Sequence, residues 1–337
     1  MSKAGPKKSK SRGGCVLRLL AFAALAGAVL FAIADHYFNL RSNLTYLAFR
    51  GTSAPLEVHL SDGTWKNAST LSHHELDRAL VKKADANGVT WSRLRIRRKA
   101  DGALQHLAQT CFNSEVNVIE FVPQHFQFAT SFREHFGLTT ARERLETGDL
   151  LFSITANFRD PKGKPLGLVV HEGQQRNAPF PAWTGYFFVK DGKPWFGPKT
   201  LFEETPGLLT EAAQGYPSVM KNHTVFSYVD LAPNKYFDGE KITYRAVAGM
   251  RQNGTIVFIL SGNGGVMNVA EAAALAQKLN VQHATLLDGG RALQYSLRLA
   301  GRTYHFAAYN TELETKWKPL ERQRSPVFIT VRHDFSP

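Results

Sequence analysis

An apolar run near the N-terminus constrains this chain more than any other feature. From Cys15 to Ala34 every residue except Arg18 is apolar or small. A helix of that length spans about 30 Å, the hydrocarbon thickness of a bilayer. Residues 1–14 are rich in Lys, Ser and Gly and contain no acid. We therefore predict a basic cytoplasmic tail over 1–14, a transmembrane signal-anchor over 15–34, and an extracytoplasmic body that is periplasmic or extracellular.

The same run also permits a cleaved signal peptide, because Ala32-Ile33-Ala34 resembles a small-x-small cleavage site. We favour the uncleaved anchor, since the apolar stretch exceeds the ~7–15 residues usual for the core of a signal peptide. Both interpretations export the body from the cytosol. Residues 35–54 are expected to form a juxtamembrane connector.

The charge distribution argues against a nucleic-acid partner. The chain has 41 Lys and Arg against 28 Asp and Glu, a net charge of +13. Six of the cations precede Asp35, where no acid occurs, which leaves +7 for the rest of the chain. A body with so modest an excess lacks the basic patch of a dedicated nucleic-acid binder.

Residues 55–119 have the pattern of a small αβ segment. Leu56–Leu60 alternates as a strand does, and Ser72 is placed to cap a short helix. Arg93–Arg97 alternates cations with apolar residues, which predicts a strand with one cationic face, and Val116–Val122 predicts another strand. Together with the preceding span, this segment resembles the periplasmic module of proton-driven biopolymer-transport subunits.

Residues 120–337 change to many short strands with few helices. The expected helices are Thr139–Glu146 and Val269–Leu279. The expected strands are Leu150–Thr155, Leu168–Val170, Tyr186–Lys190, Val225–Val229, Thr243–Ala248, Ile256–Leu260 and Ala284–Leu287. This texture predicts an α+β fold, a mixed β-sheet domain with a few helices.

The stretch 243–296 carries the strongest chemical signal. It contains an Asn253-Gly254 hairpin turn, a glycine-rich loop over Ser261–Gly265 that leads into a helix, and Asp288 after a strand. An Asp at the end of a strand places a carboxylate at a sheet edge. A dinucleotide fingerprint is the alternative, but Met267 stands where the third glycine is required and no further strand–helix units follow.

In several motifs the chain resembles the phosphodiester glycosidase family, over about residues 120–332. The matching motifs, in chain order, are Asp160–Leu168, Gln214-Gly215-Tyr216-Pro217, Tyr244–Gly249, the loop and helix Ser261–Leu279 with Glu271-Ala272-Ala273, Leu287-Asp288-Gly289-Gly290, and Arg324–Val327. Two places depart from the family pattern. Thr155-Ala156-Asn157 replaces Asn-Ala-Gly, so Asn157 would supply the polar contact. Arg291 replaces a glycine, where it would bind phosphate or fill the pocket.

The resemblance implies hydrolysis of a sugar–phosphate diester at the anomeric carbon. It makes Asp288 the carboxylate near that carbon and Arg245 a phosphate clamp, because a guanidinium matches two phosphoryl oxygens. Glu271 is the candidate second carboxylate. The candidate substrate-binding residues are Asn157, Gln214, Gly289, Gly290 and Arg291. We therefore expect a sugar-phosphate or glycan substrate, in an envelope polymer, for a membrane-tethered hydrolase.

Structural roles for these residues remain open. Arg245 and Asp288 could form a buried ion pair, and Glu271 could act on the helix dipole alone. No cofactor or metal site is expected, since His73-His74 lacks the spacing of a ligand pair, although an oxygen-liganded Ca²⁺ stays open. The alternative functions are a catalytically inactive glycan- or phosphate-binding protein and an envelope scaffold of the same fold.

Overall fold

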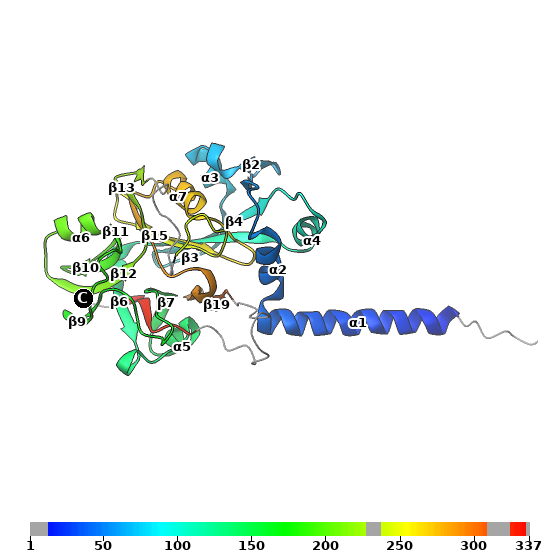
Figure 1. Cartoon of the computed structure of the whole chain (residues 1–337), viewed down its shortest axis with the longest axis horizontal. Helices are drawn as coiled ribbons and strands as arrows, with labels where there is room; N and C mark the ends of the chain where they lie inside the picture. The colour runs from blue at the N-terminus through cyan, green and yellow to red at the C-terminus, as the bar shows by residue number, and fades with distance from the viewer. Residues whose placement is uncertain (1–12, 227–236, 309–323, 335–337) are drawn as a thin grey trace, which may run out of the picture.

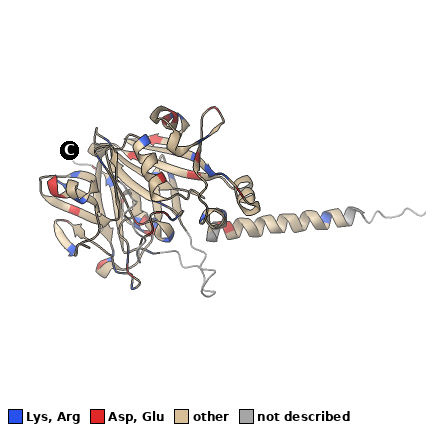
Figure 2. Ribbon diagram, turned by 45° about the horizontal axis from the view of Figure 1, so that its top comes forward, with Lys and Arg blue, Asp and Glu red and all other residues tan. Residues whose placement is uncertain are grey.

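The computed structural model describes residues 13–226, 237–308 and 324–334. Helix α1 (Gly13–Phe38) projects from the body as a single rod (Figure 1). The segment Val16–Asp35 is long and apolar enough to cross a membrane, and none of it is buried against the body. Figure 2 shows α1 nearly free of charge, whereas Lys, Arg, Asp and Glu are spread over the body. An apolar helix that the described residues of the body leave uncovered has the character of a membrane span or of a signal sequence.

The chain turns sharply between α1 and α2 (Leu40–Phe49). Asn39 adopts a left-handed backbone with φ of 46°, a conformation that asparagine tolerates. Its Nδ2 donates to the Ala307 carbonyl at 3.3 Å, and an Arg41–Asp35 ion pair of 2.7 Å spans the turn. The expected connector over 35–54 is therefore largely helical and held against the body.

Three β-sheets form the body. The largest has ten strands: β14 (Thr224–Val225), β13 (Ser218–Lys221), β17 (His283–Leu286), β15 (Ala246–Met250), β16 (Ile256–Ser261), β5 (Ser114–Phe121), β4 (Val89–Arg98), β1 (Leu56–His59) and β2 (Trp65–Asn67) in spatial order, with β3 (Val81–Ala86) beside β4. The second contains β11 (Lys193–Pro198), β10 (Gly185–Lys190), β12 (Leu209–Gly215), β8 (Val169–His171) and β9 (Gln174–Asn177). The third contains β19 (Arg302–Ala307), β18 (Gln294–Leu299), β7 (Leu150–Thr155), β20 (Val327–His333) and β6 (Phe126–Phe132).

Aromatic side chains join the three sheets into one core. The ring of Phe258 on β16 lies 4.8 Å from that of Phe152 on β7 and 5.4 Å from that of Phe196 on β11. All three side chains are fully buried. Rings at these separations and tilted angles add to the stabilisation that burial alone supplies.

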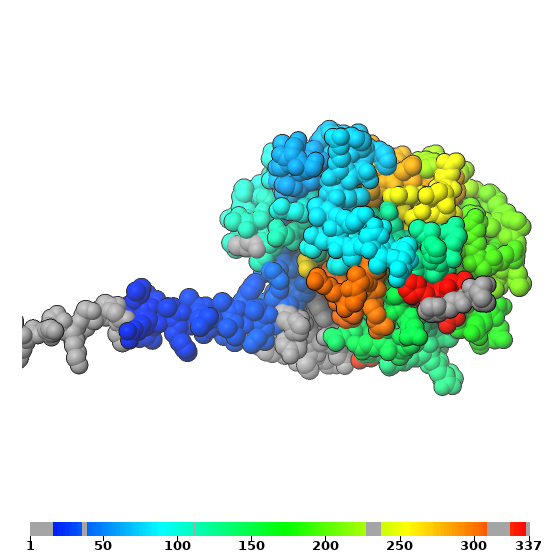
Figure 3. All heavy atoms as spheres, turned by 180° about the vertical axis from the view of Figure 1, so that it is seen from behind, coloured from blue at the N-terminus to red at the C-terminus, as the bar shows by residue number. Residues whose placement is uncertain are grey.

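The remaining helices are short and cover the edges and one face. They are α3 (His73–Ala79), α4 (Ala103–Cys111), α5 (Ala141–Glu146), α6 (Lys199–Glu204) and α7 (Val269–Lys278). Helix α7 buries Val269, Ala272, Ala273, Leu275 and Ala276. These residues belong to the same core cluster as Val247 and Leu286 of the large sheet. Figure 3 shows the body as a compact mass from which α1 stands out.

The predicted α+β class is confirmed. The Asn253-Gly254 turn joins β15 and β16, and Gly254 has the positive φ of 88° that such turns require. The cationic face predicted on β4 is also present, since burial alternates along Arg93–Arg97. The strand expected over 225–229 is only partly described, as β14 ends at Val225.

The segment 55–119 is part of the large sheet. Strand β5 pairs along its length with β16, from Val116↔Ser261 to Phe121↔Ile256. The boundary expected between 119 and 120 therefore falls inside β5. Sequence periodicity predicts strands but not their pairing. Because the large sheet is continuous, residues 55–119 form one folding unit with the strands that carry the glycosidase motifs.

Candidate active site

The candidate site lies where the three sheets meet. Asp288 follows β17 of the large sheet, Asn157 follows β7 of the third sheet, and Gln214 is on β12 of the second. One backbone and one side-chain hydrogen bond hold these ends together. Asp288 N–H donates to the Ala156 carbonyl at 3.0 Å, and Asn157 Nδ2 donates to the Gln214 carbonyl at 3.0 Å.

Asp288 is a buried carboxyl with few compensating partners. Its exposed fraction is 5%. Burial raises its pKa to about 8, while the nearby Arg159 cation and a hydrogen bond from Gly289 N–H act in the opposite direction. Desolvation disfavours the charged form, so the carboxyl of Asp288 holds a proton at neutral pH. A carboxyl with a pKa near the working pH is suited to exchanging protons with a substrate.

The two glycines after Asp288 are required by packing. A Cβ on Gly289 would lie 2.8 Å from the Tyr244 carbonyl oxygen, and Gly290 has a φ of +57°. Gly290 N–H donates to the same carbonyl at 2.7 Å. Residues 288–290 therefore pack closely against the backbone that precedes β15. Arg291 follows on the short turn η4 (Gly290–Ala292), with its side chain exposed.

Asn157 is fully buried and offers one unused acceptor. Its Nδ2 donates to the carbonyls of Leu166, Leu168 and Gln214 at 3.0–3.2 Å. Its Oδ1 is buried and has no hydrogen-bond partner among the residues that the structure describes. A buried carbonyl oxygen without a donor is costly, so Oδ1 is a natural acceptor for a ligand hydroxyl.

Gln214 has no such capacity left. Its Oε1 accepts from Leu168 N–H and Phe180 N–H at 2.9 and 2.8 Å. Its Nε2 donates to the carbonyls of Phe180 and Trp183 and to Tyr186 Oη, each at 2.9 Å. With both ends of its amide satisfied, Gln214 positions the loops around Asn157.

The guanidinium of Arg245 bonds to backbone carbonyls and, among the described residues, not to the carboxyl of Asp288. Extending the β15–β17 register by two residues from Val247↔Leu286 sets Arg245 opposite Asp288. However, its Nη2 donates to the carbonyls of Asp238 and Lys241, both at 2.7 Å, and its Nε donates to Met267 at 3.3 Å. Burial lowers its pKa to about 10, so it remains charged at neutral pH. Through these hydrogen bonds, Arg245 links the start of β15 to the segment 238–241.

The carboxylate of Glu271 also has partners other than Asp288. Its carboxylate forms an ion pair with Arg98 of β4, with Nη1 2.9 Å from Oε1. It accepts from Asn268 N–H at 2.9 Å while Asn268 Oδ1 caps the Glu271 N–H at 2.9 Å. This reciprocal capping box begins α7. The structure does not bring Glu271 into contact with Asp288.

Thr155 and Arg159 complete the site, and sequence reasoning did not single out Arg159. Thr155 Oγ1 lies 3.1 Å from the Ala292 carbonyl and 3.3 Å from that of Gln294, so it joins β7 to β18. Arg159, two residues after Asn157, is half-buried and is the cation that acts on Asp288. Its place between the motif segments Thr155-Ala156-Asn157 and Asp160–Leu168 was the available signal.

Aromatic side chains that are distant in sequence surround these residues. The Trp183 ring lies 4.9 Å from that of Phe158 and 6.0 Å from that of Tyr216, and the Tyr216 ring lies 5.1 Å from that of Phe237. This cluster adjoins Asn157 and Gln214, because Phe158 follows Asn157 in the chain and the Trp183 carbonyl accepts from Gln214 Nε2 at 2.9 Å.

Comparisons with known proteins agree with this arrangement. Residues 149–326 match the family model described as phosphodiester glycosidase. In fold, the chain is similar to the catalytic domain of zebrafish N-acetylglucosamine-1-phosphodiester alpha-N-acetylglucosaminidase, auto-inhibited by its pro-peptide. The TM-score is 0.53 at 12% identity, over 75% of this chain and 88% of that one.

A hypothetical protein from Synechocystis has a TM-score of 0.51 at 12% identity, over 75% of this chain and 63% of that one. No curated protein matches the chain. The family model spans more than half of the residues, including Asn157, Gln214, Arg245 and Asp288. The chain therefore belongs to the phosphodiester glycosidase family.

Proposed function

We propose that this protein is a membrane-tethered, extracytoplasmic hydrolase that cleaves a glycosyl phosphodiester in an envelope glycan. Water replaces the phosphate at the anomeric carbon: the C–O bond to phosphate breaks, and the products are a free sugar and a phosphomonoester. Family membership supports the reaction class. The apolar α1 supports the tether, which leaves the body on the extracytoplasmic side.

The observation that carries the proposal is the buried Asp288 carboxyl, with its pKa raised to about 8, beside the Arg159 cation. We assign Asp288 the proton exchange: its protonated form donates to the departing phosphate oxygen, and the resulting carboxylate accepts a proton from water. Positioned proton transfer of this kind contributes roughly 10²–10⁴-fold to a rate.

Arg159 and the exposed Arg291 are assigned to the phosphate. Guanidinium groups bind phosphoryl oxygens in a planar, two-point geometry, and both residues adjoin the run that carries Asp288 or Asn157. The unpartnered Oδ1 of Asn157 accepts a hydrogen bond from a sugar hydroxyl. Gln214, Arg245, Gly289 and Gly290 act through the geometry they impose, while Glu271 holds Arg98.

The test is turnover of a chromogenic sugar-1-phosphodiester by the full chain in detergent. Asp288→Asn should lower kcat by about 10²–10⁴-fold without loss of the folded state. Asp149→Asn, at an exposed position, is the matched control and should retain full activity. Wild-type protein that binds the substrate without turnover would instead identify a catalytically inactive binding protein.

A further inference from the structure

The end of the body nearest α1 carries an apolar helical face that no other described part of the chain covers. Leu104 and Leu107 of α4 are 53% and 57% exposed and lie one helical turn apart. Outside α1, the other exposed large apolar side chains among the described residues are Val81, Val122, Leu208 and Phe226, which come from separate elements or loops. Two exposed leucines on one helical face mark a surface that contacts something apolar.

The opposite face of α4 is fastened to the body. Gln105 Nε2 donates to the Ala48 carbonyl of α2 at 3.1 Å, and Ala108 is 2% exposed. Gln105 Oε1 accepts from Asp101 N–H at 2.7 Å and caps the start of the helix. Because this inner face is fixed, the orientation of the two leucines is also fixed relative to α2 and, through the turn at Asn39, to α1.

The position of α4 relative to α1 identifies the apolar partner. Figures 1, 2 and 3 agree that α4 forms the edge of the body from which α1 departs, alongside the root of that helix. If α1 crosses a bilayer along its own axis, α4 lies at the bilayer surface. The occupant of the apolar face is then the membrane that holds α1.

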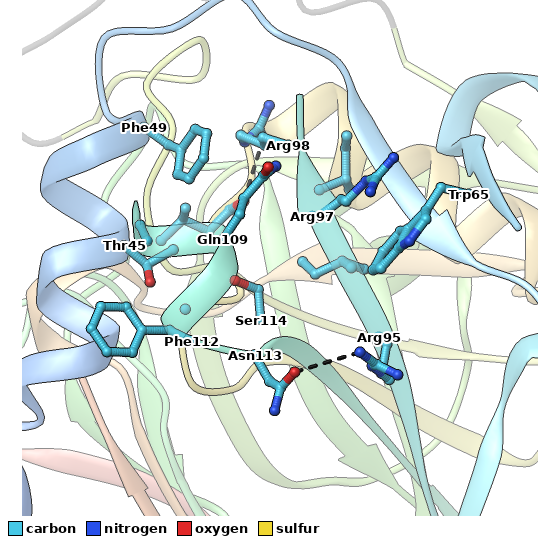
Figure 4. Close-up of a pocket in the computed structure, with 15 residues that line it drawn as sticks. Thr45, Phe49, Trp65, Arg95, Arg97, Arg98, Gln109, Phe112, Asn113 and Ser114 are labelled. Carbon is cyan, nitrogen blue, oxygen red and sulfur yellow. Dashed lines mark hydrogen bonds between the residues drawn. The ribbon is translucent and has the colours of Figure 1, made fainter. Parts of the chain in front are cut away.

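A cationic cavity lies beneath α4 (Figure 4). It has a volume of about 110 Å³ and is lined by Arg95 and Arg97 of β4, Trp65 of β2, Gln109 of α4 and Asn113, among others. The Arg97 guanidinium lies 4.3 Å from the Trp65 ring centroid and that of Arg95 lies 6.0 Å from it. Residues 95–113 contain four cations and one acid, Asp101.

Donors in this cavity have spare capacity. Arg97 is paired with Glu57, with Nε 2.7 Å from Oε2. Arg95 is exposed, and its one side-chain hydrogen bond to a described residue is a long one of 3.5 Å to Asn113. Gln109 Nε2 is buried without a partner among the described residues. An Arg and an amide donor in an open cavity are the groups that bind a phosphate.

We propose that α4 and the cavity beneath it form a membrane-contact surface for an anionic phospholipid bilayer. Leu104 and Leu107 enter the interfacial region, as the apolar face of an interfacial helix does, and Arg95 binds a lipid phosphate. This proposal rests on the proposed tether. Docking at a second point limits the rotation of the body about α1 and holds the catalytic sheet at a set height above the bilayer.

The test uses the full chain in lipid nanodiscs, with Cys15→Ser and Cys111→Ser removing the native thiols. An environment-sensitive fluorophore is attached at Leu104→Cys, and its quenching by a shallow lipid-borne quencher is measured. Leu208→Cys, an exposed leucine before β12, is the matched control. The label at position 104 should be quenched and that at 208 should not. Equal, water-like signals at both positions overturn the proposal.

A label at Leu25→Cys reports separately on insertion of α1. Failure of quenching at position 25 refutes the tether, whereas the signal at position 104 decides whether α4 contacts the membrane.

The charge component of the proposal is tested by comparing phosphatidylglycerol with phosphatidylcholine nanodiscs. One surface cation contributes a roughly fivefold preference for an anionic bilayer, so Arg95→Gln should remove about that factor and Arg332→Gln, on β20, should not. An unchanged lipid preference in Arg95→Gln refutes the phosphate contact.

Discussion

The guanidinium of Arg98 holds the carboxylate of Glu271 across the junction between β4 and α7, with Nη1 2.9 Å from Oε1. Arg98 also donates to the Ala54 carbonyl at 2.7 Å. The N-terminal strands and the glycosidase helix are therefore joined by a largely buried ion pair, in which the Arg98 side chain is 3% exposed and that of Glu271 is 18% exposed.

Removing the Glu271 charge should affect stability and leave catalysis nearly intact. Glu271→Gln leaves Arg98 buried without its counter-charge, a change that costs about 3 kcal/mol or more in comparable pairs. Denaturant unfolding monitored by tryptophan fluorescence measures the loss. Glu146→Gln, which breaks an exposed pair with Arg142, should cost less than about 1 kcal/mol. A fall in kcat of Glu271→Gln with unchanged stability would restore its catalytic assignment.

Asp288 should make the protein less stable as pH rises. The ordinary pKa of an Asp carboxyl is 3.8 and that of Asp288 in the folded protein is about 8, so between these values the folded state binds the extra proton. Stability then falls with increasing pH through this window, by up to about 1.4 kcal/mol per pH unit from this group. Asp288→Asn lacks this slope and should be the more stable protein at pH 8.

The measurement is the midpoint of thermal unfolding for both proteins from pH 4.5 to 8.5. The difference between them should widen with pH and level off above about 8. Parallel curves for the two proteins would mean that Asp288 is ionised in the folded state.

Arg159 should set the alkaline limit of activity. Because its charge lowers the Asp288 pKa, Arg159→Gln should move the alkaline limb of the kcat profile to higher pH. Loss of a phosphate contact should also raise KM. The control is Arg176→Gln, at an exposed position on β9. An alkaline limb that does not move in Arg159→Gln would separate this residue from Asp288.

Gly289 should tolerate no side chain. A Cβ there would lie 2.8 Å from the Tyr244 carbonyl oxygen, which accepts a hydrogen bond from Gly290 N–H at 2.7 Å. Gly289→Ala should therefore displace residues 288–290, and this displacement should cost about 1–3 kcal/mol of stability and most of the activity. Gly51→Ala, where no atom lies within 4 Å of the added Cβ, should change neither. Normal unfolding and turnover in Gly289→Ala would contradict this packing.

Local patterns in the chain were sufficient for several of its elements and for the position of the candidate carboxyl. Apolar length predicted α1, alternation predicted the cationic face of β4, and Asn253-Gly254 predicted the β15–β16 hairpin. The position of Asp288 at a strand end followed from the same kind of local reading, because strand periodicity and turn chemistry depend on neighbouring residues.

The partners of long side chains were decided by the tertiary structure. Arg245 precedes a strand that places it opposite Asp288, yet its flexible side chain donates to the carbonyls of Met267, Asp238 and Lys241. Glu271 meets Arg98, which is 173 positions away in the chain. Arg159 acquires its importance only because β7 and β17 end side by side. Periodicity gives the face of an element, whereas desolvation and pairing depend on which distant segments fold against it.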